Sequence, residues 1–168
     1  HMKMLEDSLV KFFSDESNFE NLKHLMTNKN AQPRLLDYYV TQYSKNEPEF
    51  FIQHDGLHDV YNSYKCHLKG FHKRYFNLFC KKNHIEFKSN GKVIVLPLAK
   101  ANVYKWMLNC GITSMLETKH KSIQKRYYEF RKNSLSKCNK RGKLSTFLSC
   151  PTLVKGVSKG KKKNVSNK

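Results

Sequence analysis

The sequence predicts an α+β protein, a mostly helical single domain with one β-hairpin near residues 84–96 and a basic C-terminal tail. Apolar residues recur at helical spacing through most of residues 5–130, and Asn90-Gly91 stands between two runs of β-prone residues. After residue 136, Ser, Lys, Gly and Asn dominate. A length of 168 residues suits one domain, and 11 Phe and 9 Tyr predict a buried core, because disordered chains are poor in aromatic residues.

Three helices are expected before residue 50. The first covers residues 5–13, whose leucines and phenylalanines fall on one side. The second covers residues 18–27, with Ser17 or Asn18 as the residue that caps its N-terminus. The third lies near residues 34–44, where apolar residues repeat every three or four positions.

A short strand is expected at residues 50–52, followed by a turn at residues 55–56 and a helix over residues 58–69. Gly70 makes continuation of this helix uncertain, because glycine is a poor helix former. If the helix does continue, three cations form a basic stripe along it: Lys65, Lys69 and Lys73.

The β-hairpin is the clearest local signal in the sequence. Residues 84–88 and 92–96 are β-prone, and the Asn90-Gly91 pair between them favours a type I′ turn, in which both central residues have positive φ. Helices followed by a hairpin are also the order of a winged helix, which we consider as an alternative description of the fold.

Two helices follow the hairpin. Pro97 ends the second strand, and a helix over residues 98–110 is expected to stop at Gly111. The last helix is expected over residues 114–134. The predicted organisation has three parts: an acidic N-terminal helical segment at 1–33, a globular core at 34–135 and a basic, largely flexible tail at 136–168.

Charge is distributed very unevenly along the chain. Residues 1–60 contain 6 Lys/Arg and 10 Asp/Glu, whereas residues 61–168 contain 26 Lys/Arg and 3 Asp/Glu. The total is a net charge of +19. Such a basic region attracts polyanions. A general enrichment in lysine would raise the positive charge along the whole chain, so it does not by itself explain a basic region that is confined to one part.

We therefore predict binding of nucleic acid, with duplex DNA preferred, through phosphate contacts. The residues expected to make these contacts are Lys65, Lys69, Lys73, Arg74, Lys81, Lys82, Lys121, Lys125, Arg126, Arg131, Lys132, Lys137, Lys140, Arg141 and Lys143. The negatively charged part at 1–60 is a candidate shield for this basic surface. The clusters at 137–143 and 159–163 also suit an import receptor.

Metal and cofactor sites are not predicted. The five cysteines have long spacings that fit reduced thiols, and a zinc site among nearby residues lacks the usual paired short spacing: Cys66, His67, His72, Cys80 and His84. The sequence contains no run of about 18 apolar residues, so no membrane span is predicted.

Two other functions are compatible with parts of this sequence. A metal-dependent nuclease needs converging carboxylates, for which Asp55, Asp59 and Glu86 with Lys88 are the candidates. A stacking platform for single-stranded bases needs exposed aromatic rings. The candidates for that platform share a helical spacing: Phe71, Tyr75, Phe76 and Phe79.

Residues 38–112 resemble a small domain of nucleocytoplasmic large DNA viruses, including marseilleviruses and mimiviruses. Its pattern runs roughly SYK-x-QLK, FDPFCRR-x-RI-x-F and GQLNFFRW. The chain departs from it at Asn77-Leu78, where the pattern has Asp-Pro, and at residues 99–101. The chain shares with the pattern the runs Ser63-Tyr64-Lys65 and Leu68-Lys69. It also shares these later positions: Phe76, Phe79, Cys80, Lys81, Lys82, Ile85, Phe87, Asn102 and Trp106. The resemblance implies a viral source more than a mechanism, because the family has no known catalytic activity.

The expected function is sequence-independent binding of duplex DNA by a viral architectural or virion-associated protein, acting in the host nucleus or viral factory. A sequence-specific transcription regulator, a small nuclease and an adaptor for basic proteins remain alternatives. The sequence does not decide the oligomeric state.

Overall fold

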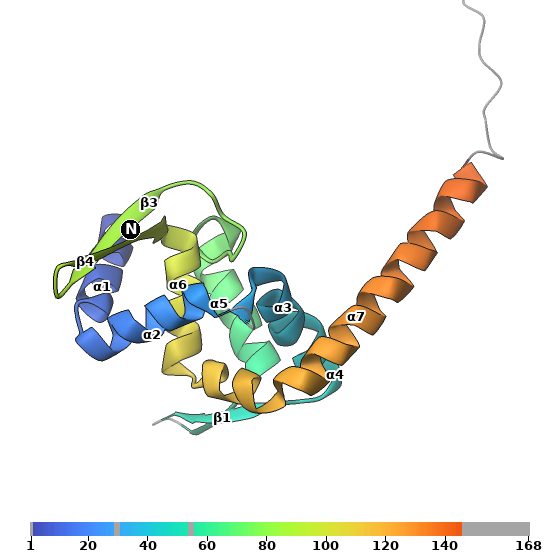
Figure 1. Cartoon of the computed structure of the whole chain (residues 1–168), viewed down its shortest axis with the longest axis horizontal. Coiled ribbons are helices and arrows are strands. Elements are labelled where there is room, and N and C mark those ends of the chain that lie inside the picture. The colour runs from blue at the N-terminus through green and yellow to red at the C-terminus, as the bar shows by residue number, and fades with distance from the viewer. Residues whose placement is uncertain (1, 29–30, 54–55, 146–168) are drawn as a thin grey trace, which may run out of the picture. The chain divides into compact units, whose positions relative to one another are not determined.

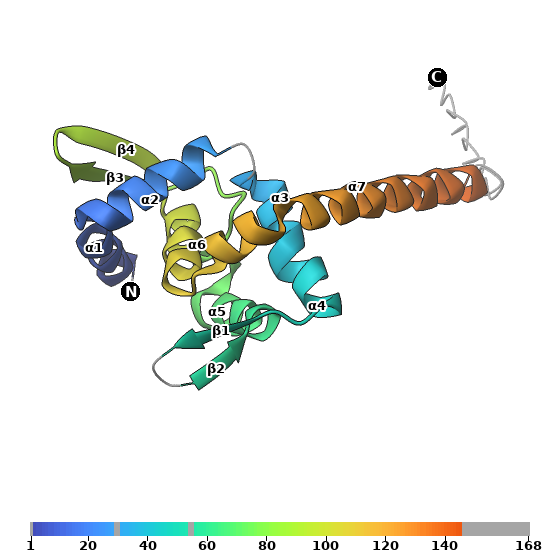
Figure 2. The same cartoon turned by 60° about the horizontal axis from the view of Figure 1, so that its bottom comes forward.

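The computed structural model describes residues 2–28, 31–53 and 56–145, and within 136–145 it describes the backbone alone. The chain divides into an N-terminal unit, His1–Phe130, and a C-terminal unit, Arg131–Lys168. In the N-terminal unit, helices surround a central helix, and two small antiparallel hairpins lie on opposite sides (Figures 1 and 2). This architecture confirms the predicted α+β class with a mostly helical domain.

Helices α1 (Met2–Phe13) and α2 (Glu16–Thr27) form where the sequence predicts the first two helices. The cap of α2 is Asp15 and not Ser17 or Asn18, because its carboxylate accepts a hydrogen bond from the backbone N–H of Asn18 at 3.0 Å. Both helices bury side chains in the same core as the rest of the N-terminal unit: Leu9, Phe13, Phe19, Leu22 and Leu25. The acidic first part of the chain is thus packed into the domain.

The third predicted helix consists of three helical pieces. α3 (Pro33–Tyr38) begins at a proline, whose fixed φ suits the first helical turn. A π-helical segment, η2 (Tyr39–Tyr43), follows, and α4 (Ser44–Asn46) ends this part of the chain. The buried Ser44 hydroxyl donates to the carbonyl of Tyr39, five residues earlier, at 2.8 Å and so supports the wider turn.

The first hairpin pairs β1 (Phe50–Gln53) with β2 (Gly56–Asp59). β1 confirms the predicted strand, whereas β2 was not predicted. The register places Ile52 opposite Leu57, and both side chains are exposed. The predicted turn at 55–56 lies partly outside the described residues.

The second hairpin pairs β3 (His84–Ser89) with β4 (Lys92–Pro97), as predicted. Asn90 and Gly91 have φ values of 48° and 72°, which are the positive angles that a type I′ turn requires. Phe87 and Leu96 are buried, and the ring of Phe87 lies 4.9 Å from that of Phe13 on α1. The hairpin therefore covers the N-terminal helices.

Helix α6 (Leu98–Asn109) is the central helix and is almost entirely buried. It ends at Gly111, whose φ of 63° is the left-handed conformation expected of a residue that stops a helix. Helix α5 (Val60–Tyr75) packs beside it. Between them lies an aromatic cluster that includes Tyr64, Phe76 and Trp106, with ring centroids 5.6–5.8 Å apart.

Helix α7 (Ile112–Ser145) is longer than the predicted helix of 114–134. Its apolar periodicity ends near residue 130, but no proline interrupts the chain before Pro151, so the helical backbone continues. Residues 136–145 are helical where we predicted a tail, and residues 146–168 lie outside the described residues. Helices of the described part of the chain include none with the length and hydropathy required to cross a bilayer.

Candidate nucleic-acid interface

The basic part of the N-terminal unit is concentrated on α5 and the loop that follows it. Asp59 starts the helix, because its carboxylate accepts a hydrogen bond from the N–H of Asn62 at 2.7 Å. From there to residue 85 the sequence contains no acid. Six cations lie in this stretch, and all are exposed: Lys65, Lys69, Lys73, Arg74, Lys81 and Lys82. We call these six residues the basic face.

The predicted stripe of lysines along one helix is interrupted. His72 has φ 58° and ψ 152°, so α5 is kinked shortly after Gly70. Non-glycine residues rarely adopt this region, and such strain is commonly found at functional sites. Lys65 and Lys69 precede the kink, and Lys73 and Arg74 follow it. The cations are consequently spread over two differently directed segments.

A cleft of about 430 Å³ lies beside the basic face. One group of its lining residues comes from α3, η2 and α4, and the other comes from α5 and the loop after it. Its lining residues are Asp37, Thr41, Gln42, Lys45, Tyr61, Tyr64, Lys65, Leu68, Lys73, Phe76, Asn77 and Phe79. We call it the lysine–aromatic cleft. Lys45 was not among the predicted contact residues, since it lies in the acidic third and no local pattern marks it.

The predicted aromatic face of residues 71–79 does not exist as a single helix face, because α5 ends at Tyr75. Phe76 is fully buried, whereas Phe79 is 49% exposed. The Asn77 side chain accepts a hydrogen bond from the N–H of Phe79 at 2.9 Å and so shapes the turn that carries this ring. Phe79 is the member of the predicted set that a stacking platform would use.

The predicted contact residues of α7 fall into two groups. Lys121 and Lys125 are exposed and form no ion pair among the described residues. Arg126 instead pairs with Glu47, and its guanidinium lies 5.5 Å from the ring centroid of Tyr43. The charge of Arg126 is therefore largely neutralised by partners within the N-terminal unit.

Other carboxylates of the acidic part also pair with later cations. Glu49, which is buried, binds Lys119 with both oxygens at 2.6 and 2.8 Å, and this hydrogen bonding raises the pKa of the Lys119 amine. Glu20 binds Lys92 on β4 at 2.6 Å. None of the ion pairs among the described residues involves the basic face. The carboxylates thus pair with Lys119 and Arg126 of α7 and with the lysines of the second hairpin, and leave the basic face unpaired.

The C-terminal unit contains the remaining predicted contact residues. Arg131 and Lys132 are exposed on the helix. Lys137, Lys140, Arg141 and Lys143 lie on the same helical backbone, and their side chains are outside the described part. The import clusters lie in part in residues 146–168, which the structure does not describe.

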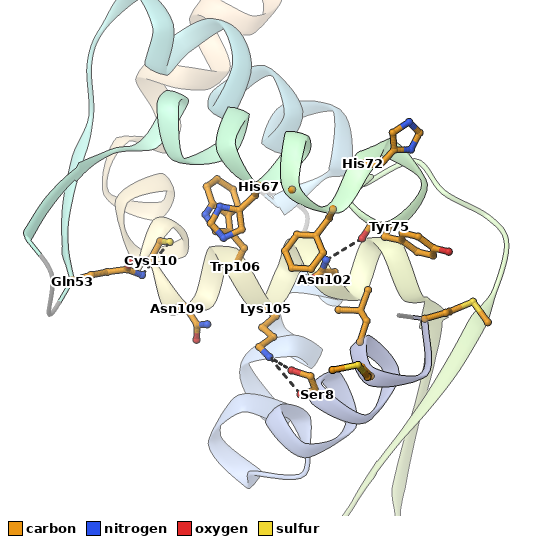
Figure 3. Close-up of a pocket in the computed structure, with 15 residues that line it drawn as sticks. Ser8, Gln53, His67, His72, Tyr75, Asn102, Lys105, Trp106, Asn109 and Cys110 are labelled. Carbon is orange, nitrogen blue, oxygen red and sulfur yellow. Dashed lines mark hydrogen bonds between the residues drawn. The ribbon is translucent and has the colours of Figure 1, made fainter.

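A larger cavity of about 740 Å³ lies among α1, β1, α5 and α6 (Figure 3). Lys105 donates to the hydroxyl of Ser8 at 2.8 Å, and burial lowers the pKa of its amine. Cys110 accepts a weak hydrogen bond from Gln53, and burial raises the pKa of its thiol to about 12. His67 lies beside Trp106 in this cavity. The polar groups of this cavity are thus bonded in pairs, Lys105 with Ser8 and Gln53 with Cys110.

The candidate nuclease residues that the structure describes have structural roles. Asp59 caps α5, and Glu86 forms an ion pair with Lys88 at 3.4 Å on β3. Asp55 lies outside the described residues. No group of three or more His, Cys, Asp or Glu residues in the described ranges could hold a metal ion.

Comparisons with known proteins found one family and one curated relative, and neither has an assigned activity. The pattern of a family described as "Family of unknown function (DUF7197)" matches residues 1–156. "Uncharacterized protein L507" of Acanthamoeba polyphaga mimivirus is 28% identical over 143 residues, which are 78% of this chain and 55% of the relative. The chain thus spans about half the length of this curated relative. No solved structure matches.

Proposed function

Because the chain belongs to the DUF7197 family, whose function is unknown, we propose a function from its surface: the protein binds duplex DNA with little sequence preference through the basic face. The observation that carries the proposal is the division of the cations. Several cations of the second hairpin and of α7 are paired with carboxylates. The six cations of the basic face, on α5 and its loop, form no ion pair in the described part of the chain.

Unpaired, exposed lysines are suited to phosphates. DNA holds condensed counterions, and each phosphate neutralised by a protein cation releases part of them into solution. The resulting gain in entropy does not depend on base sequence. Lysine also presents a flexible point charge, so several of these residues can adapt to phosphates at different spacings.

The surface offers little for base reading in the major groove. Direct readout uses a helix or β-ribbon whose side chains bond to base edges, typically from Arg, Lys, Asn or Gln. Of the two cations, lysine is a flexible point charge and lacks the rigid planar fork with which arginine makes directed bidentate bonds. Five of the six residues of the basic face are lysines, and the sole arginine, Arg74, follows the kink in α5. This composition favours sequence-independent binding over a sequence-specific regulator.

The similarity to a mimivirus protein supports a setting in which such binding is useful. A giant virus must compact and handle a large DNA genome, so a place in the viral factory, the host nucleus or the virion is part of the proposal. The cations of the C-terminal unit would add further phosphate contacts or bind an import receptor.

The test is the salt dependence of affinity, measured by fluorescence anisotropy with the full chain and a 20-bp duplex. A triple variant of the basic face, Lys69→Gln, Arg74→Gln and Lys81→Gln, should bind more weakly. Its slope of log affinity against log salt should fall by up to about 2.7, since each phosphate contact contributes about 0.9. Single-stranded DNA and duplex RNA serve as comparison ligands.

A matched control removes the same charge elsewhere. Lys11 lies on α1, and Lys88 and Lys92 already pair with Glu86 and Glu20. The triple variant Lys11→Gln, Lys88→Gln and Lys92→Gln should keep a slope close to that of the wild type. Equal slopes for the two triple variants would show that net charge, and not the basic face, determines binding.

A further inference from the structure

The lysine–aromatic cleft differs from the surrounding basic surface because it is concave and contains aromatic rings. Its volume of about 430 Å³ lies within the range of roughly 300–1,000 Å³ that is typical of small-ligand sites. A regular duplex presents its phosphates on the outside and its bases stacked inside, so it cannot fill a cleft of this kind. A cleft beside a phosphate-binding surface requires a different part of the nucleic acid.

From this arrangement we infer that the cleft accepts one unpaired nucleotide of a DNA strand, with its base against Phe79 and its phosphates on Lys45, Lys65 and Lys73. The inference rests on the proposed function and deepens it. It names a structural feature of the substrate, an extrahelical nucleotide, that the cleft would recognise in addition to duplex DNA.

The aromatic lining supports the position of the base. Phe79 is about half exposed, although exposed phenylalanine is costly in water, and it has no ring partner among the described residues. Tyr61 also lines the cleft, and the Lys65 amine lies 5.8 Å from the centroid of its ring. Bases stack on exposed aromatic rings regardless of sequence, and nearby cations strengthen this binding.

The charges of the cleft define an orientation. Three of its lining residues are lysines, contributed by α4 and by α5 on both sides of the kink. The cleft also contains one carboxylate, that of Asp37, whose pKa is raised because burial removes water from it. A phosphate is repelled by this carboxylate and attracted by the lysines, whereas the N–H groups of a base can donate to it. The base therefore points toward Asp37.

Both groups of lining residues include a departure from regular helix. Thr41 and Gln42 belong to the π-helical segment η2, and Lys73 directly follows the strained residue His72. π-helical turns and strained backbone are both over-represented at functional sites. That two such features flank one cleft is an observation independent of its charge.

The test compares a blunt 20-bp duplex with the same duplex carrying a single extrahelical nucleotide, using the full chain and fluorescence anisotropy. The wild-type protein should bind the bulged duplex about 5- to 150-fold more tightly, which is the affinity that one stacked base supplies. Phe79→Leu should abolish this preference and leave the affinity for the blunt duplex unchanged. Phe79→Tyr, which keeps the ring, should retain the preference.

Each other outcome has a defined meaning. Equal affinities for the two duplexes, or a preference that persists in Phe79→Leu, would overturn the inference and leave the proposed function standing. Failure to bind either duplex would overturn both. Full displacement of the bulged duplex by micromolar deoxyguanosine monophosphate would show a site for free nucleotides, and so would overturn the assignment to a DNA strand. Circular dichroism checks that the variants fold.

Discussion

The indole N–H of Trp106 on α6 donates a hydrogen bond to the hydroxyl of Ser63 on α5 at 3.1 Å. Ser63 and Trp106 are both positions at which the sequence resembles the viral domain pattern, and Phe76 and Asn102 lie close to the same contact. Asn102 donates to the carbonyl of Tyr75 at 3.0 Å and so fixes the end of α5. These shared residues therefore hold α5 against α6 and position the basic face.

Ser63→Ala should destabilise the protein by about 1–3 kcal/mol, because it leaves the nearly buried N–H of Trp106 without a partner. Since Trp106 is the only tryptophan in the sequence, its fluorescence reports unfolding in urea directly at this contact. Ser114→Ala, at an exposed position of α7, should change stability by no more than about 0.5 kcal/mol. An unfolding midpoint that is the same in Ser63→Ala and wild type would contradict the role of the bond.

Arg126→Gln should lower stability by up to about 1 kcal/mol without changing the salt dependence of DNA binding. The substitution removes the ion pair with Glu47 and the contact with Tyr43, both of which are partly solvent-exposed and hence weak. Lys121→Gln, on the same helix but without an ion pair, should leave the melting temperature unchanged. A reduced salt slope in Arg126→Gln would return this residue to the set of phosphate contacts.

Gly91→Ala and Gly70→Ala should shift stability in opposite directions. Gly91 has φ 72°, which a residue with a Cβ adopts at a cost of about 1 kcal/mol, although no atom would obstruct the added methyl group. Gly70 lies in α5 in open space, and alanine there should stabilise by about 0.5–1 kcal/mol. Urea denaturation of the two variants measures both effects, and destabilisation by Gly70→Ala would show that the kink at His72 depends on this glycine.

Stability should fall as the pH rises from about 10 to about 12. Burial raises the pKa of Tyr104 from its ordinary value of 10.0 to about 12, so in this range the unfolded chain loses the phenolic proton while the folded protein keeps it. A shift of this size corresponds to roughly 2–3 kcal/mol. Tyr104→Phe should reduce the loss of stability in urea titrations between pH 9 and 11.5. Identical pH profiles for the variant and wild type would contradict this account.

The sequence predicts most elements because they depend on local patterns. The second hairpin follows from Asn90-Gly91, and the end of α6 follows from Gly111. The strand β2 escapes prediction because Gly56–Asp59 is neither β-prone nor alternating, and it is extended only because β1 pairs with it. Apolar spacing over five residues likewise cannot distinguish the π-helical segment from an α-helix.

The basic face could be found from charge alone, but its use could not. Whether a lysine is free or paired depends on contacts between residues far apart in sequence, such as Glu49 with Lys119, 70 positions later. The lysine–aromatic cleft was missed for the same reason. Lys45 joins Lys65 and Lys73 through packing of the π-helical segment near α5, and its own neighbours in the sequence give no indication of this.

The contact between α2 and α7 has a consequence for how the protein is made. His24 and Glu117, whose side chains meet at 3.0 Å, are 93 residues apart, and Lys105 reaches Ser8 over 97 residues. At a synthesis rate of about 5–20 residues per second, the first helices therefore wait roughly 5–20 s for their partners on the ribosome. During this interval the apolar sides of α1 and α2 lack their later partners in the core, and transiently exposed apolar surface of this kind favours aggregation.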